Sequence, residues 1–261
     1  MKLLIDAGNT RIKWALVNDA TEWLCSGVLP TAQADKLAQH IADHLDKHET
    51  GLQDIQQIWV SNVAGEGIAQ DIRNIGVGKS TQVHFIAARE TQCGVHNGYS
   101  PSYQLGSDRW AALIAAWHLV QEKCLVVNSG TAITIDTLSE HGEFLGGLIL
   151  PGLELMQCNL IAATQMKLAE GQMELTQGKY APFPLTSADA LYSGAIQASC
   201  GAIERQYTLL NDNNASLVLS GGSAGLLRPH LNQRLFKAPP CVADNLVLQG
   251  LLLIAQEVDR P

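Results

Sequence analysis

Two similar stretches stand about 120 residues apart: residues 3–13 read LLIDAGNTRIK, and residues 125–136 read LVVNSGTAITID. In each, an apolar run leads into a short turn of acid or amide, glycine and hydroxyl residues, and a second apolar run follows. Asn-Gly turns favour β-hairpins, although here the order is Gly-Asn. Backbone N–H groups in such a turn can surround a phosphate. The repetition predicts a duplicated domain with a nucleotide between its halves.

The first half is expected to run β-β-β-α-β-α-β. Its helix after the third strand is amphipathic, because Leu37, Ile41 and Leu45 recur at four-residue spacing, and Thr31 is its expected cap. The expected strands are 2–7, 11–17, 22–29, 58–63 and 82–87, and the expected helices are 31–47 and 66–75.

The second half repeats this order after a loop at 88–104 and an apolar helix at 106–121. Its expected strands are 124–128, 132–138, 143–149 and 216–220, and its expected helices start at Pro151-Gly152 and span 187–210 and 246–257. We expect two similar α/β lobes, residues 1–105 and 106–261, with a ligand cleft between them. The alternative, that glycine-rich hairpins recur by chance, is disfavoured by the shared element order.

Composition excludes several function classes. With 17 Lys and Arg against 25 Asp and Glu, the net charge is −8, which argues against general binding to nucleic acid or anionic membranes. The six cysteines are scattered, without the spacing of a disulfide framework or zinc site, so we expect most to be buried. No apolar stretch is long enough to span a bilayer. We expect a cytoplasmic protein.

The first turn, Asp6-x-Gly8-Asn9-Thr10, suits phosphate and metal binding. Gly8 permits positive φ and close backbone approach, while the amide and hydroxyl that follow add donors. Arg11 or Lys13 can add positive charge. Asp6 suits Mg²⁺ held through water, because that ion prefers few carboxylates and several waters. The alternative is an ordinary Asx turn at the end of a strand.

Two further segments complete the nucleotide pattern. Asn128-Ser129-Gly130-Thr131-Ala132 offers equivalent donors, but its first residue is an amide without charge. The segment 217–224 reads LVLSGGSA, a buried strand followed by a turn at Gly221 and Gly222. Two glycines let the backbone lie flat against a planar ring, which favours an adenine site there.

These three motifs, in this order, resemble the phosphate and adenosine motifs of the superfamily of acetate kinase, sugar kinases, Hsp70 and actin. The implied fold is a duplicated ribonuclease H-like, or actin-like ATPase, fold. Three intervening segments resemble type III pantothenate kinases across nearly the whole chain: residues 97–99 (NGY), 105–110 (LGSDRW) and 146–152 (GGLILPG).

The resemblance implies ATP-dependent phosphorylation of pantothenate to 4'-phosphopantothenate, the first step of coenzyme A synthesis. It also implies a homodimer that uses Mg²⁺ and a monovalent cation, K⁺ or NH₄⁺. The residues that match the ATP site are Asp6, Ala7, Gly8, Asn9, Thr10, Arg11, Ile12, Lys13, Gly130, Thr131, Ala132, Gly221 and Gly222.

Asp108 matches the catalytic aspartate of the family and is the candidate base, because phosphoryl transfer needs a group that accepts the substrate hydroxyl proton. A helix N-cap is its alternative role. Arg109 would contact the pantothenate carboxylate or steady Asp108. The other residues matched to the substrate site are Tyr99, with Asn97 and Gly98, then Gly106, Ser107 and Ser187, with Thr186 as an adjacent candidate or a helix cap.

Asn128 departs from the family, which usually has Asp at this position as part of a metal or monovalent-cation site. Asp6, Asp108 and the nearby Asp136 remain. The departure leaves open a regulatory homologue that binds nucleotide or pantothenate without turnover. A kinase for sugar or acetate is a third hypothesis, without a matching substrate loop. The apolar helices 106–120, with Trp110 and Trp117, and 246–257 are candidates for a dimer interface or for core.

Overall fold

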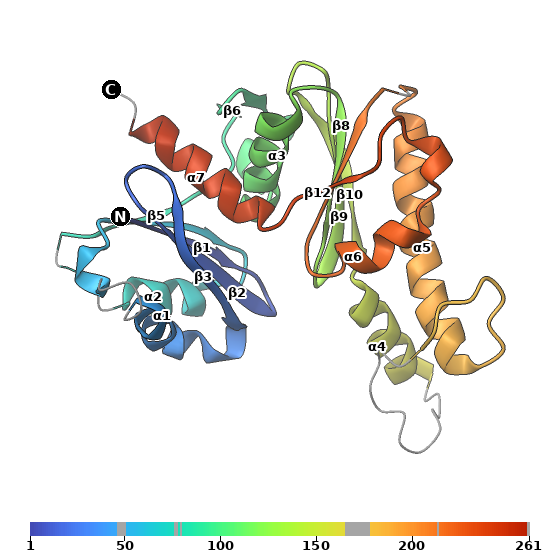
Figure 1. Cartoon of the computed structure of the whole chain (residues 1–261), viewed down its shortest axis with the longest axis horizontal. Helices are drawn as coiled ribbons and strands as arrows, with labels where there is room; N and C mark the ends of the chain where they lie inside the picture. The colour runs from blue at the N-terminus through green and yellow to red at the C-terminus, as the bar shows by residue number, and fades with distance from the viewer. Residues whose placement is uncertain (46–50, 76–77, 79, 165–177, 213, 260–261) are drawn as a thin grey trace. The chain divides into compact units, whose positions relative to one another are not determined.

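The computed structural model describes residues 1–45, 51–75, 78, 80–164, 178–212 and 214–259 (Figure 1). The chain divides into two compact units. The first comprises Met1–Leu119 together with Asn245–Pro261, and the second comprises Val120–Asp244. Each unit contains one five-stranded sheet.

The first sheet has the strand order β3-β2-β1-β4-β5. β1 is antiparallel to β2, and β2 to β3, whereas β4 is parallel to β1, and β5 to β4. The strands are β1 (Lys2–Ala7), β2 (Arg11–Val17), β3 (Trp23–Pro30), β4 (Gln57–Asn62) and β5 (Gln82–Phe85).

The second sheet has the order β10-β9-β8-β11-β12, with the same pattern of parallel and antiparallel neighbours. Its strands are β8 (Cys124–Ser129), β9 (Ala132–Leu138), β10 (Phe144–Pro151), β11 (Ser216–Ser220) and β12 (Cys241–Val242). Two sheets with identical order and direction confirm the expected duplication.

Strand periodicity divides the residues of the first sheet between two faces. On one face, Leu3 and Ile5 join a buried core with Leu37 and Ile41 of α1 (Leu37–Leu45) and with Ile72 of α2 (Glu66–Arg73). α7 (Leu246–Val258) packs against β1 and β4. Figure 1 shows α1 and α2 on the side of this sheet opposite to α7.

α3 (Ser107–Val120) and α7 pack closely within the first unit. A Cβ at Gly250 of α7 would overlap the backbone of Ala111 in α3, so only glycine permits this approach. Because of this packing, α3 and α7 belong with the first sheet, although both follow residue 105 in sequence. Trp110 is fully buried, so this part of α3 forms core and not a free surface.

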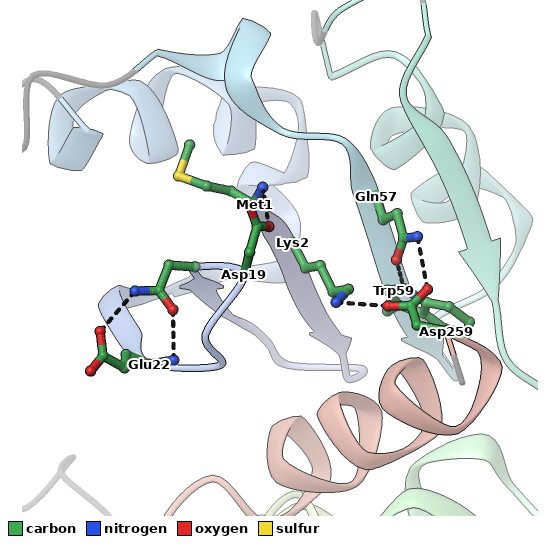
Figure 2. Close-up of polar contacts among 8 residues, drawn as sticks. Met1, Lys2, Asp19, Glu22, Gln57, Trp59 and Asp259 are labelled. Atoms are coloured by element: carbon green, nitrogen blue, oxygen red, sulfur yellow. Dashed lines mark hydrogen bonds and ion pairs between the residues drawn. The ribbon is translucent and has the colours of Figure 1, made fainter. Parts of the chain in front are cut away.

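The end of α7 is anchored at the beginning of β1 and β4 (Figure 2). Lys2 Nζ lies 2.8 Å from Asp259 Oδ2, and Gln57 Nε2 donates to Asp259 Oδ1 at 3.2 Å. Trp59 Nε1 in turn donates to Gln57 Oε1 at 2.9 Å. The hydrogen bond from Lys2 is the main cause that lowers the pKa of Asp259. These contacts fix α7 along the sheet.

The second unit has its main core between its sheet and α5 (Ser187–Leu209). Ile133 and Ile135 of β9 face Ile196 and Ile203 of this helix in one buried cluster. The other helices of the unit are α4 (Leu153–Thr164) and the short α6 (Ala224–Leu227).

Several shorter elements complete the described chain. A two-stranded ladder pairs β6 (Thr91–Gln92) with β7 (Val95–His96). The 3₁₀ helices are Thr31–Lys36, Leu52–Asp54, Ser102–Gln104, Arg228–His230 and Gln233–Leu235. No helix in the described ranges combines the length and apolar character needed to cross a membrane.

Three sequence expectations need correction. The helix expected at 31–47 is a 3₁₀ segment followed by α1, because Gln33 has non-helical dihedral angles, and residues 46–47 lie outside the described residues. Thr31 makes no cap bond in the 3₁₀ helix; its hydroxyl donates to Gly8 O at 2.7 Å. The cysteines are free, but only Cys124 and Cys200 are buried.

Candidate functional site

The β1–β2 turn presents an exposed loop of polar residues. Four residues, 8–11, separate the last strand pair, Ala7 and Ile12, and Gly8 N donates to Arg11 O at 3.1 Å. Thr31 holds this loop, since its N–H donates to Thr10 O at 3.0 Å and its hydroxyl donates to Gly8 O. Asn9, Thr10 and Arg11 are exposed at the tip. The turn is therefore held in shape from behind while its tip remains accessible.

Gly8 serves this turn in a different way from the one expected. Its φ lies outside the left-handed region. A Cβ at Gly8 would instead lie 3.2 Å from Arg11 O, tighter than ordinary packing. Glycine is favoured here because the turn closes tightly, and the expectation of positive φ is wrong.

Asp6 lies at the end of β1, opposite Lys13 on β2 and beside Ser61 on β4. Burial, and then the negative charge of Asp108, raise the pKa of Asp6 to about 7, while Lys13 acts in the opposite direction. Near neutral pH the ionised carboxylate of Asp6 therefore has too little positive charge around it. A bound cation would supply the missing positive charge, so the carboxylate suits a metal site.

The donor set is also compatible with Mg²⁺. Among the residues that the structure describes, no group of three or more His, Cys, Asp or Glu side chains is arranged to hold a metal. Mg²⁺ typically binds through one or two carboxylates together with waters and substrate phosphates. A single carboxylate beside an exposed glycine turn agrees with that mode.

The β8–β9 turn repeats the first with one residue fewer. Three residues, 130–132, separate the last pair, Ser129 and Ile133, and Gly130 N donates to Ala132 O at 2.9 Å. Gly152 N donates to Thr131 O at 2.9 Å, and a Cβ at Gly152 would overlap the backbone of Gly130 and Thr131. Gly130, Thr131 and Ala132 are exposed.

Asn128 occupies the place in this unit that Asp6 occupies in the first. It lies opposite Thr134 on β9 and beside Ser220 on β11. Asp136, further along the same face of β9, is buried. The fold thus retains the geometry of the first strand end, with an uncharged amide at the position of the acid.

The glycine turn after β11 packs directly on the end of β8. Gly221 has φ +93°, and a Cβ there would overlap the backbone of Ser129. Ser223 N donates to Ser129 O at 3.0 Å. Gly222 is exposed. Residue 221 must therefore be glycine, both because of its positive φ and because a side chain would not fit.

The start of α3 gathers the predicted substrate residues of the first unit. Asp108 lies in the first helical turn, and its Oδ1 accepts from Arg109 N at 2.8 Å. A Cβ at Gly106 would lie 2.6 Å from this oxygen, so glycine leaves room for the carboxylate. Arg109 Nη1 donates to Tyr99 Oη at 3.3 Å, and its guanidinium lies 5.7 Å from the centroid of the ring.

Asn97 shapes the loop before α3. Its Oδ1 accepts from Tyr99 N at 2.9 Å, and its Nδ2 donates to Ser102 O at 3.0 Å. These bonds orient the backbone that carries Tyr99. Gly98 is exposed.

Ser187 lies apart from these residues in sequence and belongs to the second unit. It is the exposed first residue of α5. The cap role falls to Thr186, whose hydroxyl accepts from Asp189 N at 3.2 Å. Ser187 therefore has an accessible hydroxyl, whereas that of Thr186 already caps the helix.

Sequence reasoning missed two residues of the first unit that support the site. Thr31 was assigned to a cap, yet its bonds hold the β1–β2 turn. Ser61 was counted only as part of an apolar strand, yet its Oγ shares a hydrogen bond of 2.9 Å with Ser107 Oγ. A polar residue at the end of a buried strand is the available signal for Ser61.

Comparison with known proteins agrees with this geometry. The duplicated sheets and glycine turns define an actin-like ATPase fold, the class that includes sugar kinases. Among solved structures, the activator of the 2-hydroxyisocaproyl-CoA dehydratase from Clostridium difficile with bound ADPNP matches with a TM-score of 0.54 and 11% identity, covering 100% of this chain and 98% of that one.

The sequence comparisons narrow this class to one family. The family model for type III pantothenate kinase matches residues 2–209. A type III pantothenate kinase from Nitrosospira multiformis is 45% identical, covering 99% of this chain and 92% of the relative. Another, from Nitrosomonas eutropha, is 40% identical, with 97% and 94% covered. The chain belongs to the type III pantothenate kinase family.

Proposed function

We propose that this chain transfers the γ-phosphoryl group of ATP to the primary hydroxyl of pantothenate, in the cytoplasm, as the first step of coenzyme A synthesis. Family membership supports the substrate and the reaction. The observation that carries the mechanism is the hydrogen bond of Ser61 with Ser107, which brings the start of α3 to the strand that pairs with Asp6.

Asp108 is the proposed base. Its position at the start of α3, with one carboxylate oxygen bonded to Arg109 N, fixes the side chain while leaving it partly exposed. A carboxylate there can accept the proton of the attacking hydroxyl as the phosphoryl group transfers. Gly106 leaves the space that this orientation needs.

Arg109 and Tyr99 are proposed to bind pantothenate together with Gly106, Ser107 and Ser187. Arg109 is buried, and its guanidinium lies over the Tyr99 ring and donates to Tyr99 Oη, so its direction is fixed. A fixed guanidinium can make a two-pronged contact with the carboxylate of pantothenate. Ser187 is included because it matches a substrate-contacting position of the family, and it is exposed.

The exposed first turn is proposed to bind the ATP phosphates, with donors from residues 8–11 and positive charge from Arg11 and Lys13. Asp6 is proposed to hold Mg²⁺ through water. When bound, Mg²⁺ neutralises charge on the phosphate oxygens. Ala7 and Ile12 are the buried strand residues that support this turn.

In the second unit, Gly130, Thr131 and Ala132 are proposed to add phosphate donors, and Gly221 and Gly222 to contact the adenine. Asn128 is proposed to contact a monovalent cation, K⁺ or NH₄⁺, through its amide oxygen. Without the charge of an acid this contact is weaker than the one that Asp provides.

A homodimer is also proposed. The expected interface helices, α3 and α7, are largely buried within the first unit. In the second unit, the edge strand β10 exposes Leu148 and Ile149, and α4 exposes Leu155 and Leu160. This exposed apolar group favours contact with a second copy. Light scattering of the Ile149→Glu variant should show monomer where the natural chain shows dimer.

The function is tested by ADP release with pantothenate, ATP, Mg²⁺ and K⁺. Replacement of the base, Asp108→Asn, should lower kcat by about 10²–10⁴-fold. Glu66→Gln is the matched control, because Glu66 is an exposed acid in the first turn of α2. Absence of pantothenate-dependent ADP from the folded natural chain would overturn the proposed function.

A further inference from the structure

The hydroxyl pair of Ser61 and Ser107 joins two segments that are 46 residues apart. Ser61 is fully buried near the end of β4, beside Asp6 on β1. Ser107 is the first residue of α3, buried, and directly precedes Asp108. The two Oγ atoms lie 2.9 Å apart. This hydrogen bond therefore lies between the strand end that carries one acid and the helix start that carries the other.

We propose that the Ser61–Ser107 hydrogen bond positions the first turn of α3, and with it Asp108, against the end of β1 that carries Asp6. The inference deepens the proposed function and rests on it for the role of Asp108. Ser61 is a positioning residue, because it acts through Ser107 and Asp108 and is itself buried away from solvent.

The acid at each end of this contact adds to the case. The negative charge of Asp108 is one of the causes, after burial, that raise the pKa of Asp6. When both carboxyls are ionised, their like charges favour separation of the start of α3 from the end of β1. A hydrogen bond buried among packed groups is strengthened by its low-dielectric surroundings and opposes that separation.

Two other contacts hold α3 further along the helix, while Arg109, which follows Asp108, bonds to Tyr99. Gly250 of α7 packs on Ala111, one turn further along the helix. Trp110 Nε1 donates to Gln92 Oε1 at 3.0 Å, which ties the helix to β6. The serine pair is the contact that ties the residue before Asp108 to β4, so its loss should change the position of Asp108 more than the stability of the helix.

The test compares Ser61→Ala, Ser107→Ala and the double variant. Each single variant leaves one buried hydroxyl without its partner, which costs stability, whereas the double variant removes both partners and relieves that cost. If the pair positions Asp108, all three variants lose kcat by about 10-fold, because small misplacement of a reacting group is costly. KM for ATP should change by less than about threefold in each.

The double variant separates positioning from stability. We expect its Tm to recover towards that of the natural chain while its kcat stays as low as in the single variants. A kcat that recovers together with Tm, or that never falls, would overturn the proposal. Ser199→Ala is the matched control. Ser199 is fully buried, and its Oγ donates to Ala195 O at 2.8 Å within α5.

Amide hydrogen exchange gives a readout that does not depend on turnover. The N–H groups of Arg109 and Trp110 bond to Asp108 Oδ1 and Gly106 O in the first turn. In Ser61→Ala these amides should exchange about 10-fold faster, with amides in the middle of α3 unchanged. Unchanged exchange in the first turn would contradict the inference, even if the natural chain proved inactive towards pantothenate.

Discussion

The β1–β2 turn and the β8–β9 turn are built on the same strand framework but differ at the position that carries charge. The first has a four-residue loop at 8–11 and places Asp6 at its strand end. The second has a three-residue loop at 130–132 and places Asn128 there. The comparison shows that the duplication preserved backbone geometry more strictly than side-chain chemistry.

The preserved geometry extends to individual backbone hydrogen bonds. Thr31 N donates to Thr10 O at 3.0 Å in the first unit, and Gly152 N donates to Thr131 O at 2.9 Å in the second. Val63 N donates to Ala7 O at 3.0 Å, and Ser223 N, one residue further along in the register, donates to Ser129 O at 3.0 Å. Similar bonds hold both turns, so differences in their function must come mainly from side chains and loop length.

The largest effect is expected from removing the acid of the first turn. Asp6→Asn should lower kcat/KM by about 10²–10³-fold, because the carboxylate proposed to hold Mg²⁺ loses its charge. Steady-state kinetics at several Mg²⁺ concentrations measure this, with Asp19→Asn as a control on an exposed acid of the same unit. A loss smaller than threefold would mean that the first turn does not carry the metal side of the site.

The next effect concerns the turn that packs on the end of β8. Gly221→Ala should destabilise the protein by about 3 kcal/mol, because a Cβ would overlap the backbone of Ser129 at a positive φ. Urea denaturation measures the change. Gly225→Ala is the control, since nothing lies within 4 Å of a Cβ there. Equal stability of the two variants would contradict the account of this turn.

A third prediction uses the raised pKa of Asp6. Folding raises the pKa of the Asp6 carboxyl, so the folded state favours the protonated form. The stability that this carboxyl contributes is complete below its ordinary pKa of 3.8 and is lost as the pH rises through about 7. The natural chain should therefore lose stability between pH 5 and pH 8, relative to Asp6→Asn, by about 2 kcal/mol, allowing for partial solvent exposure.

Denaturation of both proteins at pH 5 and pH 8, without Mg²⁺, measures this difference. Asn128 at the matching place does not titrate, so the second turn should add nothing to it. If the natural chain instead lost stability relative to Asp6→Asn as the pH fell, the sign would be opposite to the one expected.

The smallest effect is expected from giving the second turn its acid. Asn128→Asp should raise kcat/KM by about 10-fold and lower the concentration of K⁺ needed for half activity, since it adds one charge near the proposed cation. Activity assays across K⁺ concentrations measure this. A rise above about 100-fold would instead identify the natural chain as a homologue with little turnover.

Local sequence signals predicted the elements and turns well, because strand periodicity and glycine turns are encoded in neighbouring residues. The same signals could not place α7 with the first sheet, because that packing brings residues 245–259 beside residues 1–119. They also missed the contacts of Thr31 with Gly8 and of Ser61 with Ser107. Such pairs depend on how distant segments meet, and a single sequence does not record that meeting.

The most direct test of the comparison between the two turns exchanges Asp6 and Asn128. We predict that the double variant, Asp6→Asn with Asn128→Asp, keeps kcat/KM about 100-fold below that of the natural chain. The reason is that the charge of Asp108 acts on Asp6, at the end of β1, so an acid at position 128 does not replace it. ADP release with pantothenate, ATP, Mg²⁺ and K⁺ measures it. Recovery of the double variant to within threefold of the natural chain would show that the turns are interchangeable and would contradict this account.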